Sequence, residues 1–285
     1  MKELVVISGK GGTGKTSVVA SFGVLAESCV LADCDVDASD LHLILSPTVI
    51  RTEPFSGGSG AAILPENCTA CGTCETVCRF QAVIPGDPYR IDPIACEGCG
   101  VCAHFCPEPA IDFSPRINGQ WYVSETRCGP MVHARLGIAQ ENSGKLVSLV
   151  RSHAKRIAGE QGKALVLIDG SPGIGCPVIA SITGADRVLV VTEPTLSGIH
   201  DLARVVRLTR HFGVQTSVCI NKWDLNETMA LRIETQAAEW NLTVAGRVRY
   251  DPAVTAAMVH GKSIVEHTDQ GAAADIRRLW NQLTE

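Results

Sequence analysis

A glycine-rich loop near the N-terminus constrains the fold more than any other feature of the sequence. Gly9-Lys-Gly-Gly-Thr-Gly-Lys15-Thr16 fits the pattern G-x-x-x-x-G-K-[ST], follows the apolar run Leu4–Ser8 and opens a helical stretch that reaches about Glu27. Backbone N–H groups of such a loop turn around phosphate oxygens, the lysine adds a positive charge, and the threonine hydroxyl can ligate Mg²⁺. We therefore predict a phosphate-binding loop rather than a glycine-rich turn that only joins a strand to a helix.

The rest of the chain alternates between strand-like and helix-like segments. The expected strands are Cys29–Ala32, Ala164–Ile168, Arg187–Thr192, Thr216–Ile220 and Leu242–Val248. The expected helices are Lys145–Ala158, His200–His211, Thr228–Trp240 and Ala273–Leu283. This order predicts an α/β fold of the P-loop NTPase kind, with a doubly wound, mostly parallel sheet.

Eight of the 13 cysteines lie in one short segment and repeat one spacing. Both Cys68–Cys78 and Cys96–Cys106 read C-x₂-C-x₂-C-x₃-C, the run that binds [4Fe–4S] clusters in bacterial ferredoxins, where the fourth cysteine ligates the other cluster. The predicted ligands are Cys68, Cys71, Cys74 and Cys106 for one cluster, and Cys96, Cys99, Cys102 and Cys78 for the other. Zinc is the alternative, but zinc sites pair two C-x₂-C units and do not need a third cysteine at the same step.

The cysteine-rich segment also predicts the domain organisation. Residues 61–113 are too few to build a strong apolar core alone, so we expect a small ferredoxin-like α+β domain held by metal and inserted into a P-loop domain formed by residues 1–60 and 114–285. Pro54–Gly60 has the composition of a linker. Asn118-Gly119, between Ile111–Ser114 and Gln120–Ser124, predicts a hairpin.

Acidic side chains stand where a P-loop needs partners for Mg²⁺ and water. Asp33 and Asp35 follow the second expected strand, and Asp169 follows the strand at Ala164–Ile168, so all three can face the ligand crevice of a parallel sheet. Asn221-Lys-Trp-Asp224 matches N-K-x-D, which taken alone favours a guanine nucleotide.

Charge and hydropathy exclude several classes of protein. The net charge of −5 argues against a general nucleic-acid binder. No apolar run approaches the roughly 20 residues that span a bilayer, and Leu4–Ile7 is too short for a signal peptide. We expect a cytoplasmic protein without stable membrane insertion.

The second lysine of the loop, Lys10, resembles that of the deviant P-loop superfamily of MinD, ParA, ArsA and the nitrogenase iron protein. Further resemblance lies in Asp33–Ala38, His133–Gly137, Ser143–Val147, Thr192–Gly198 and Gly246–Pro252. The chain is thus similar to a MinD-superfamily ATPase that contains a ferredoxin insert.

This resemblance implies roles for individual residues. Lys10 would reach the nucleotide of a second subunit, Asp35 would orient the attacking water, and Asp33 and Asp169 would support Mg²⁺ together with Thr16. Asn221 would contact adenine, which favours ATP over GTP. Nucleotide contacts are expected from Gly11, Gly12, Thr13, Gly14, Lys15, Thr16 and Ser17. Asp251 and Pro252 would line the base pocket, unless they only form a turn before a helix.

Three functions remain open on the sequence. The first is a dimeric ATPase, a homodimer or a heterodimer with a paralogue, that controls electron transfer to a redox partner through two [4Fe–4S] clusters. The second is a carrier or scaffold for iron–sulfur clusters. The third is a MinD-like positioning ATPase, with Arg277–Leu283 as a weak candidate membrane anchor against the simpler interpretation of a core-facing helix. Cys128, Cys176, His42 and His133 are more simply interpreted as structural residues.

Overall fold

The computed structural model describes residues 1–137 and 143–284, which form two compact units. The first contains Met1–Thr52, Trp121–Arg135 and residues 143–284, and the second contains Glu53–Gln120 with residues 136–137. The segment 61–113 lies within the second unit, which extends beyond that segment at both ends.

The first unit is built on a nine-stranded sheet with the order β13-β12-β11-β1-β10-β2-β9-β8-β3. Every pair from β13 to β9 in this order is parallel. The strands of this parallel part are β1 (Lys2–Ser8), β2 (Cys29–Asp33), β9 (Gly129–Leu136), β10 (Leu165–Pro172), β11 (Arg187–Thr192), β12 (Gln215–Asn221) and β13 (Thr243–Val248). The predicted α/β fold with a large, mostly parallel sheet is therefore confirmed.

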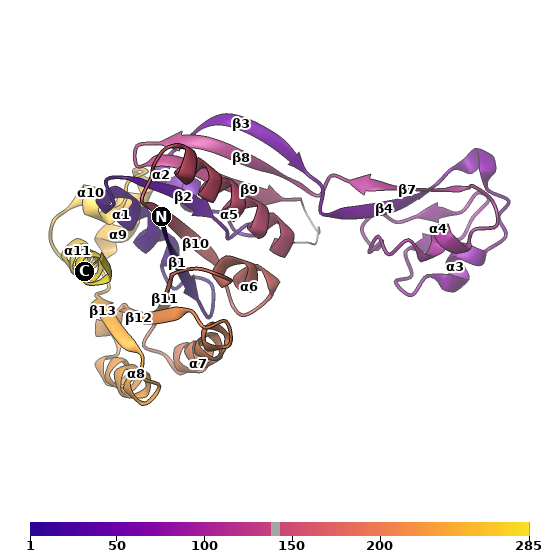
Figure 1. Cartoon of the computed structure of the whole chain (residues 1–285). Coiled ribbons are helices and arrows are strands. Elements are labelled where there is room, and N and C mark those ends of the chain that lie inside the picture. The colour runs from indigo at the N-terminus through magenta and orange to yellow at the C-terminus, as the bar shows by residue number, and fades with distance from the viewer. Residues whose placement is uncertain (138–142, 285) are drawn as a thin grey trace. The chain divides into compact units, whose positions relative to one another are not determined.

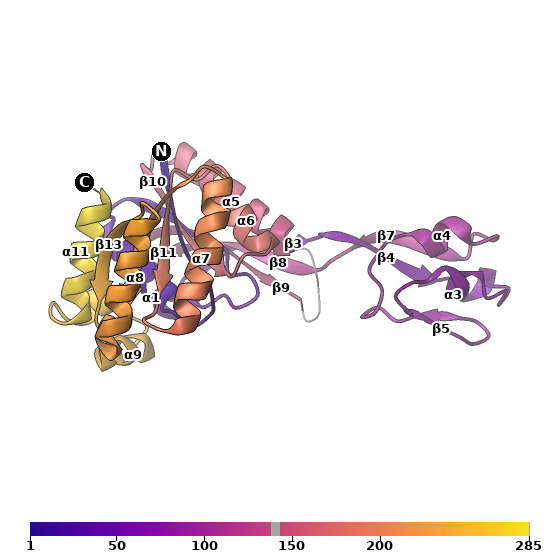
Figure 2. The same cartoon turned by 90° about the horizontal axis from the view of Figure 1, so that it is seen from below.

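Helices cover both faces of this sheet (Figures 1 and 2). Alternate strand residues such as Leu4, Val6 and Leu31 join a buried cluster with the helices α1, α2, α10 and α11, whereas α5, α6 and α7 pack against β2, β10 and β11. The helices of this unit are α1 (Lys15–Leu25), α2 (Leu41–Leu45), α5 (Ser143–Glu160), α6 (Cys176–Ile182), α7 (Leu196–His211), α8 (Glu227–Glu239), α9 (Pro252–Val259), α10 (Ile264–His267) and α11 (Ala272–Thr284).

The last helix shows why the core-facing interpretation of the C-terminal segment is correct. Ile276, Leu279 and Leu283 of α11 are buried in the cluster beside α1. Arg277 and Arg278 bind Asp269 and Asp275. Across residues 1–137 and 143–284, no helix has the length and apolar character needed to cross a bilayer.

The edge strands of the sheet differ from the sequence prediction. β8 (Gly119–Thr126) lies between β9 and β3 (Thr48–Phe55), whereas β7 (Ile111–Arg116) pairs with β4 (Gly58–Ile63) in a separate antiparallel sheet. The predicted Asn118-Gly119 hairpin is therefore wrong, and the predicted linker Pro54–Gly60 is largely strand.

The hydrogen bonds of Asn118 explain why the Asn118-Gly119 pair does not form the predicted turn. It is buried, its backbone N–H donates to Phe55 O, and its side-chain oxygen accepts from the N–H of Gly57. Its backbone oxygen accepts from Gly137 N. Asn118 thus ties together three chain segments of the second unit rather than closing a two-residue turn.

The second unit repeats one local structure around its cysteines. Its remaining elements are η1 (Pro65–Asn67), α3 (Thr73–Val77), β5 (Val83–Ile84), β6 (Arg90–Ile91) and α4 (Val101–Phe105). Gly72 and Gly100, each directly after the second cysteine of its run, are the left-handed N-caps of α3 and α4, with φ of 76° and 74°. Cys78 and Cys106 are the corresponding extended C-caps. The repeat in sequence is therefore also a repeat in backbone conformation.

Arg127, between β8 and β9, links this edge of the sheet to the helices α2 and α10. Its guanidinium donates to both carboxylate oxygens of Glu266, at 2.6 and 2.8 Å, and to the backbone oxygens of Ile44, Leu45 and Gly261. Burial raises the pKa of Glu266, but hydrogen bonds from Arg127 and Ser263 outweigh that effect and lower the pKa to about 2.

We predict that Glu266→Gln lowers the free energy of unfolding at pH 7 by about 1–3 kcal/mol, because it removes the charged partner of Arg127. The folded-state pKa of Glu266 is depressed, so its contribution is present above pH 4.5 and is lost as the pH falls towards 2. Urea unfolding at several pH values should show the two proteins converging in acid. Glu160→Gln, which breaks an exposed pair with Arg156, is the control. A difference that persisted unchanged at pH 2 would contradict this assignment.

Candidate functional site

The glycine-rich loop joins β1 to α1 at the carboxyl edge of the parallel sheet. Gly14 is the N-cap of α1 with a φ of 89°, and Gly12 has a φ of 78°, which are backbone conformations that glycine adopts without strain. Lys15 is the first residue of the helix and is buried. The hydroxyl of Thr13 is also buried, without a hydrogen-bond partner among the described residues. A loop of this shape, with a free hydroxyl and a helix N-terminus, suits an anion.

Asp35 forms a buried ion pair with the lysine of this loop. Lys15 Nζ lies 3.3 Å from Asp35 Oδ2, and the side chains are only 5% and 11% exposed. Burial raises the pKa of Asp35, and the charge of Lys15 opposes this. The pair is thus a buried, desolvated contact that phosphate oxygens can replace.

Asp33 and Asp169 meet in the interior, but they have different partners. Asp33 accepts hydrogen bonds from the Ser39 hydroxyl at 2.6 Å and from the backbone N–H groups of Asp35 and Leu41, so it fixes the loop after β2. Both carboxylate oxygens of Asp169 are buried with no hydrogen-bond partner among the described residues. Burial, followed by the charge of Asp169, raises the pKa of Asp33, and burial raises that of Asp169 to about 6.

The two carboxylate oxygens of Asp169, which lack hydrogen-bond partners among the described residues, indicate whether a divalent cation fits this site. Carboxylate and hydroxyl oxygens suit Mg²⁺, and a cation would satisfy a buried carboxylate that lacks other partners. Thr16 stands in the first turn of α1, one residue after Lys15. Of the predicted magnesium residues, Asp169 has buried oxygens without a hydrogen-bond partner among the described residues and lies beside the Thr16 hydroxyl, while Asp33 is already engaged.

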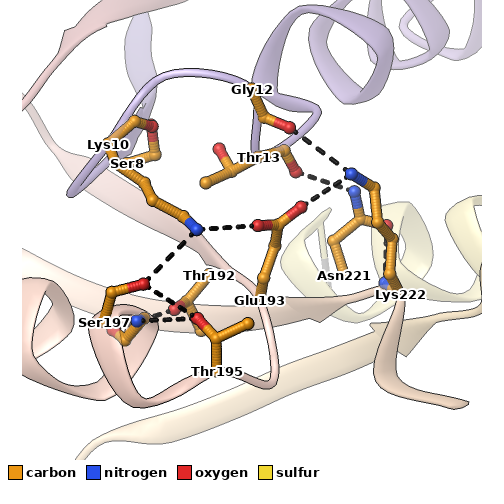
Figure 3. A network of polar contacts seen from close by, with 11 residues as sticks. Ser8, Lys10, Gly12, Thr13, Thr192, Glu193, Thr195, Ser197, Asn221 and Lys222 are labelled. Atoms are coloured by element: carbon orange, nitrogen blue, oxygen red, sulfur yellow. Dashed lines mark hydrogen bonds and ion pairs between the residues drawn. The ribbon is translucent and has the colours of Figure 1, made fainter. Parts of the chain in front are cut away.

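A second charged network surrounds the beginning of the loop (Figure 3). Glu193, directly after β11, lies 3.1 Å from Lys10 Nζ and 2.6 Å from Lys222 Nζ. Lys222 Nζ also donates to Gly12 O at 3.4 Å, and Asn221 Nδ2 donates to Thr13 O at 2.8 Å. The loop is therefore held from outside by side chains at the ends of β11 and β12.

The residues predicted for the base pocket mainly make hydrogen bonds that stabilise the local fold. Asp251 caps α9 by accepting from Ala253 N, and its other oxygen accepts from Ala272 N. Pro252 is the first residue of α9. Asp224 accepts from Tyr250 N at 2.7 Å. These contacts fit the simpler interpretation of a turn before a helix, and contact with a base remains a prediction.

Two cavities in the second unit are lined by cysteines from both runs. One is lined by Cys68, Cys71, Cys74 and Cys106, and the other by Cys78, Cys96, Cys99 and Cys102. Each set combines three cysteines of one run with the fourth cysteine of the other. In the described parts of the chain, no three His, Cys, Asp or Glu side chains converge closely enough to hold a single metal ion.

The remaining singled-out residues have ordinary surroundings. His133 is buried beside Tyr122, and its Nε2 lies 2.9 Å from the Ser124 hydroxyl; burial and His42 lower its pKa to about 4. The half-buried Cys128 accepts at its backbone oxygen from Cys29. Cys176 is exposed at the start of α6.

Sequence reasoning missed Glu193 and Ser39. Glu193 follows a strand in the same way as Asp169, so the rule that polar residues after parallel strands face the crevice could have found it. Ser39 carries no signal, because its contact with Asp33 depends on how the loop after β2 folds back.

The parallel sheet and the loop after its central strand define this chain as a P-loop nucleotide-binding protein. Residues 4–264 match the family described as the CobQ/CobB/MinD/ParA nucleotide binding domain, and the chain belongs to this family.

Relatives and solved structures agree with this assignment. The chain is 35% identical to the uncharacterized protein MJ0578 of Methanocaldococcus jannaschii over 234 residues, 79% of each chain. It is 23% identical to MJ0579 of the same organism over 94% of each chain. The septum site-determining protein MinD of Pyrococcus horikoshii, complexed with Mg-ADP, superposes with a TM-score of 0.63 at 15% identity, covering all of this chain and 96% of the other.

We predict that Gly14→Ala abolishes nucleotide binding and lowers stability by about 1–3 kcal/mol. A Cβ atom at Gly14 would lie 2.4 Å from Asn221 Nδ2, on a backbone with a φ of 89°. Titration with a fluorescent ATP analogue and thermal unfolding measure both effects. Gly159→Ala in α5, where a Cβ meets nothing within 4 Å, is the matched control and should be neutral or stabilising. Wild-type affinity in Gly14→Ala would show that the loop does not need this conformation.

Proposed function

We propose that the protein is an Mg²⁺-dependent ATPase in which nucleotide-driven dimer closure controls electron transfer through two [4Fe–4S] clusters. The observation that carries the redox half is the lining of the two cavities, each by three cysteines of one run and the last of the other. The observation that carries the nucleotide half is the loop with its buried Lys15–Asp35 pair.

The chain's own residues account for the nucleotide half. The helix N-terminus and Lys15 bind the phosphates, and Asp35, released from Lys15 by them, is free to orient a water molecule. Thr16 and Asp169 would hold Mg²⁺, which would supply positive charge against the negative charge of the phosphates. We favour ATP over GTP because the family resemblance assigns Asn221 to adenine, and MinD of Pyrococcus horikoshii is complexed with Mg-ADP.

Asp35→Asn should separate binding from hydrolysis. We expect nucleotide to bind while kcat falls by about 10²–10⁴-fold, because the neutral amide orients water poorly. Lys15 also loses its charged partner, so the variant should be less stable without nucleotide and gain more thermal stability than wild type on adding ATP. Steady-state kinetics and thermal unfolding with and without Mg-ATP measure both effects. Asp37→Asn, two residues further on, is the control. An unchanged kcat in Asp35→Asn would remove Asp35 from the mechanism.

The cysteine cavities fit iron–sulfur clusters better than a single zinc ion. Four thiolates around one zinc must converge on one point, whereas a [4Fe–4S] cubane holds its four thiolates further apart, around a cavity. Both runs place their second cysteine directly before a left-handed glycine and their third within a short helix. When bound, the clusters supply one-electron chemistry. The eight cysteines hold them, and the exposed Cys71 and Cys99 lie at the surface, where a redox partner can approach.

Paired cysteine substitutions test the ligand sets. If each cluster takes its fourth ligand from the other run, Cys78→Ala with Cys99→Ala damages one cluster and leaves about four of eight irons. Cys71→Ala with Cys78→Ala damages both. Ligation within each run predicts the reverse. Iron and sulfide analysis and EPR of the anaerobically reconstituted, dithionite-reduced proteins distinguish the outcomes. Stoichiometric zinc in a colourless protein would overturn the cluster proposal.

The chain connection between the nucleotide site and the cysteine-rich segment supports the proposed coupling. β9 holds His133 in register with Asp33, and β8, its neighbour in the sheet, continues from Asn118 of the second unit. A nucleotide-dependent change around Asp33 therefore acts on strands that lead to the cysteine-rich segment. We expect a homodimer, or a heterodimer with a paralogue, and a separate redox partner protein.

The two competing functions have less support. A cluster carrier must release its cargo, and four thiolates per cluster favour retention. A MinD-like positioning ATPase agrees with the family and the fold, but the candidate anchor at Arg277–Leu283 places its apolar side chains in the core.

A further inference from the structure

Glu193 is the acidic residue best placed to influence Lys10. Its side chain is 14% exposed, and each carboxylate oxygen contacts a different lysine: Oε2 contacts Lys10 and Oε1 contacts Lys222. Lys10, at 36% exposure, has a further contact at 3.5 Å with the Ser197 hydroxyl. In this arrangement, shown in Figure 3, the ammonium group of Lys10 is held by its own chain.

The backbone holds Glu193 firmly in this place. Its carbonyl oxygen accepts from Thr195 N at 2.8 Å, and a Cβ atom at Gly198 would lie 2.3 Å from that oxygen. The turn before α7 is therefore closely packed. On the other side, Lys222 has a left-handed backbone with a φ of 55°, which a lysine rarely adopts, and its N–H donates to Asn221 Oδ1. Local backbone contacts therefore position both Glu193 and Lys222.

Electrostatics make the contact between Glu193 and Lys10 sensitive to nucleotide. Burial raises the pKa of Glu193, but hydrogen bonds from Lys222 and Lys10 lower it overall, so the carboxylate is charged at neutral pH. Lys222 also touches the loop at Gly12 O. A triphosphate in the loop brings several negative charges near Glu193, which repel the carboxylate and compete for both lysines.

We propose that Glu193 is a positioning residue that retains Lys10 within its own protomer and so sets the nucleotide concentration at which the dimer closes. This inference rests on the proposed closure of a dimer through Lys10. A lysine bound to Glu193 must exchange the carboxylate for phosphate oxygens before it reaches the nucleotide of a second copy of this chain. Removing the charge of Glu193 therefore favours closure.

The test compares wild type with Glu193→Gln, which keeps the size of the side chain. We expect the variant to dimerise at an about three- to tenfold lower concentration of a non-hydrolysable ATP analogue, measured by sedimentation velocity on the full chain. The ATP concentration at half-maximal hydrolysis should fall by a similar factor, with kcat changed much less. Glu160→Gln, which removes an exposed carboxylate with an arginine partner, should behave as wild type.

A double substitution tests whether Glu193 acts through Lys10. Lys10→Ala with Glu193→Gln should show no gain over Lys10→Ala alone, because no lysine is left to release. Persistence of the gain without Lys10 would overturn the inference, as would weaker dimerisation in Glu193→Gln, which would mean that Glu193 aligns Lys10 for the partner. If wild type dimerises but Glu193→Gln needs the same concentration, closure stands and the inference is wrong. If wild type stays monomeric with the analogue, dimer closure itself is wrong, and the inference with it.

Discussion

Charge burial at the carboxyl edge of the sheet is the constraint on which the nucleotide site depends. Lys15, Asp33, Asp35 and Asp169 are all buried, and three of them are carboxyl groups. Taking such groups out of water is costly unless each finds a partner. Lys15 neutralises Asp35, and hydrogen bonds from the following loop stabilise Asp33. The charge of Lys15 and the hydroxyl of Thr16 oppose the effect of burial on Asp169, but neither of its buried oxygens has a hydrogen-bond partner within normal distance among the described residues, so they suit a cation.

Contacts of the same charged groups link the loop after β2 to the loop after β1. Asp33 holds the loop after β2 through Ser39 and Leu41, and Asp35 at the start of that loop contacts Lys15. In the proposed function, phosphates that draw Lys15 away would remove a constraint on Asp35, two residues from Asp33. Nucleotide binding would then change the charge balance at the end of β2 without a direct contact with it. Because β2 pairs with β9, and β9 with β8, this change would act on the strands beside β2.

The sequence predicted the strands and helices whose residue pattern lies within a single element. Apolar runs and helical periods located six of the seven parallel strands, all but β9, and the long helices beside them, because each pattern lies within one element. β3 was missed because Thr48–Phe55 is mostly exposed and has no apolar run. The pairing of β8 was wrong because Asn118 binds Phe55 O through its backbone N–H and Gly57 N through its side chain, instead of closing a turn. Glu193 was missed because its partners, Lys10 and Lys222, are far away in the sequence.

Apolar burial contributes little to the stability of the second unit. Its buried apolar side chains are few and mostly small: Phe55, Ala61, Cys74, Ala82, Val83 and Ala110. Larger ones, such as Phe105 and Ile94, are 57% and 72% exposed. Residues 53–120 also contain eight acidic residues against three arginines and no lysine, so their net charge opposes compaction.

A small acidic unit with so little apolar core needs another source of stability. The two cysteine-lined cavities lie where that source would act, because each is bordered by both runs and so joins the two halves of the repeat. Metal bonds across both cavities would add to the packing of α3 against α4. In the proposed ligand sets, the exchange of the fourth cysteine between runs would make each cluster depend on the fold of both runs, so that neither run could bind its cluster alone.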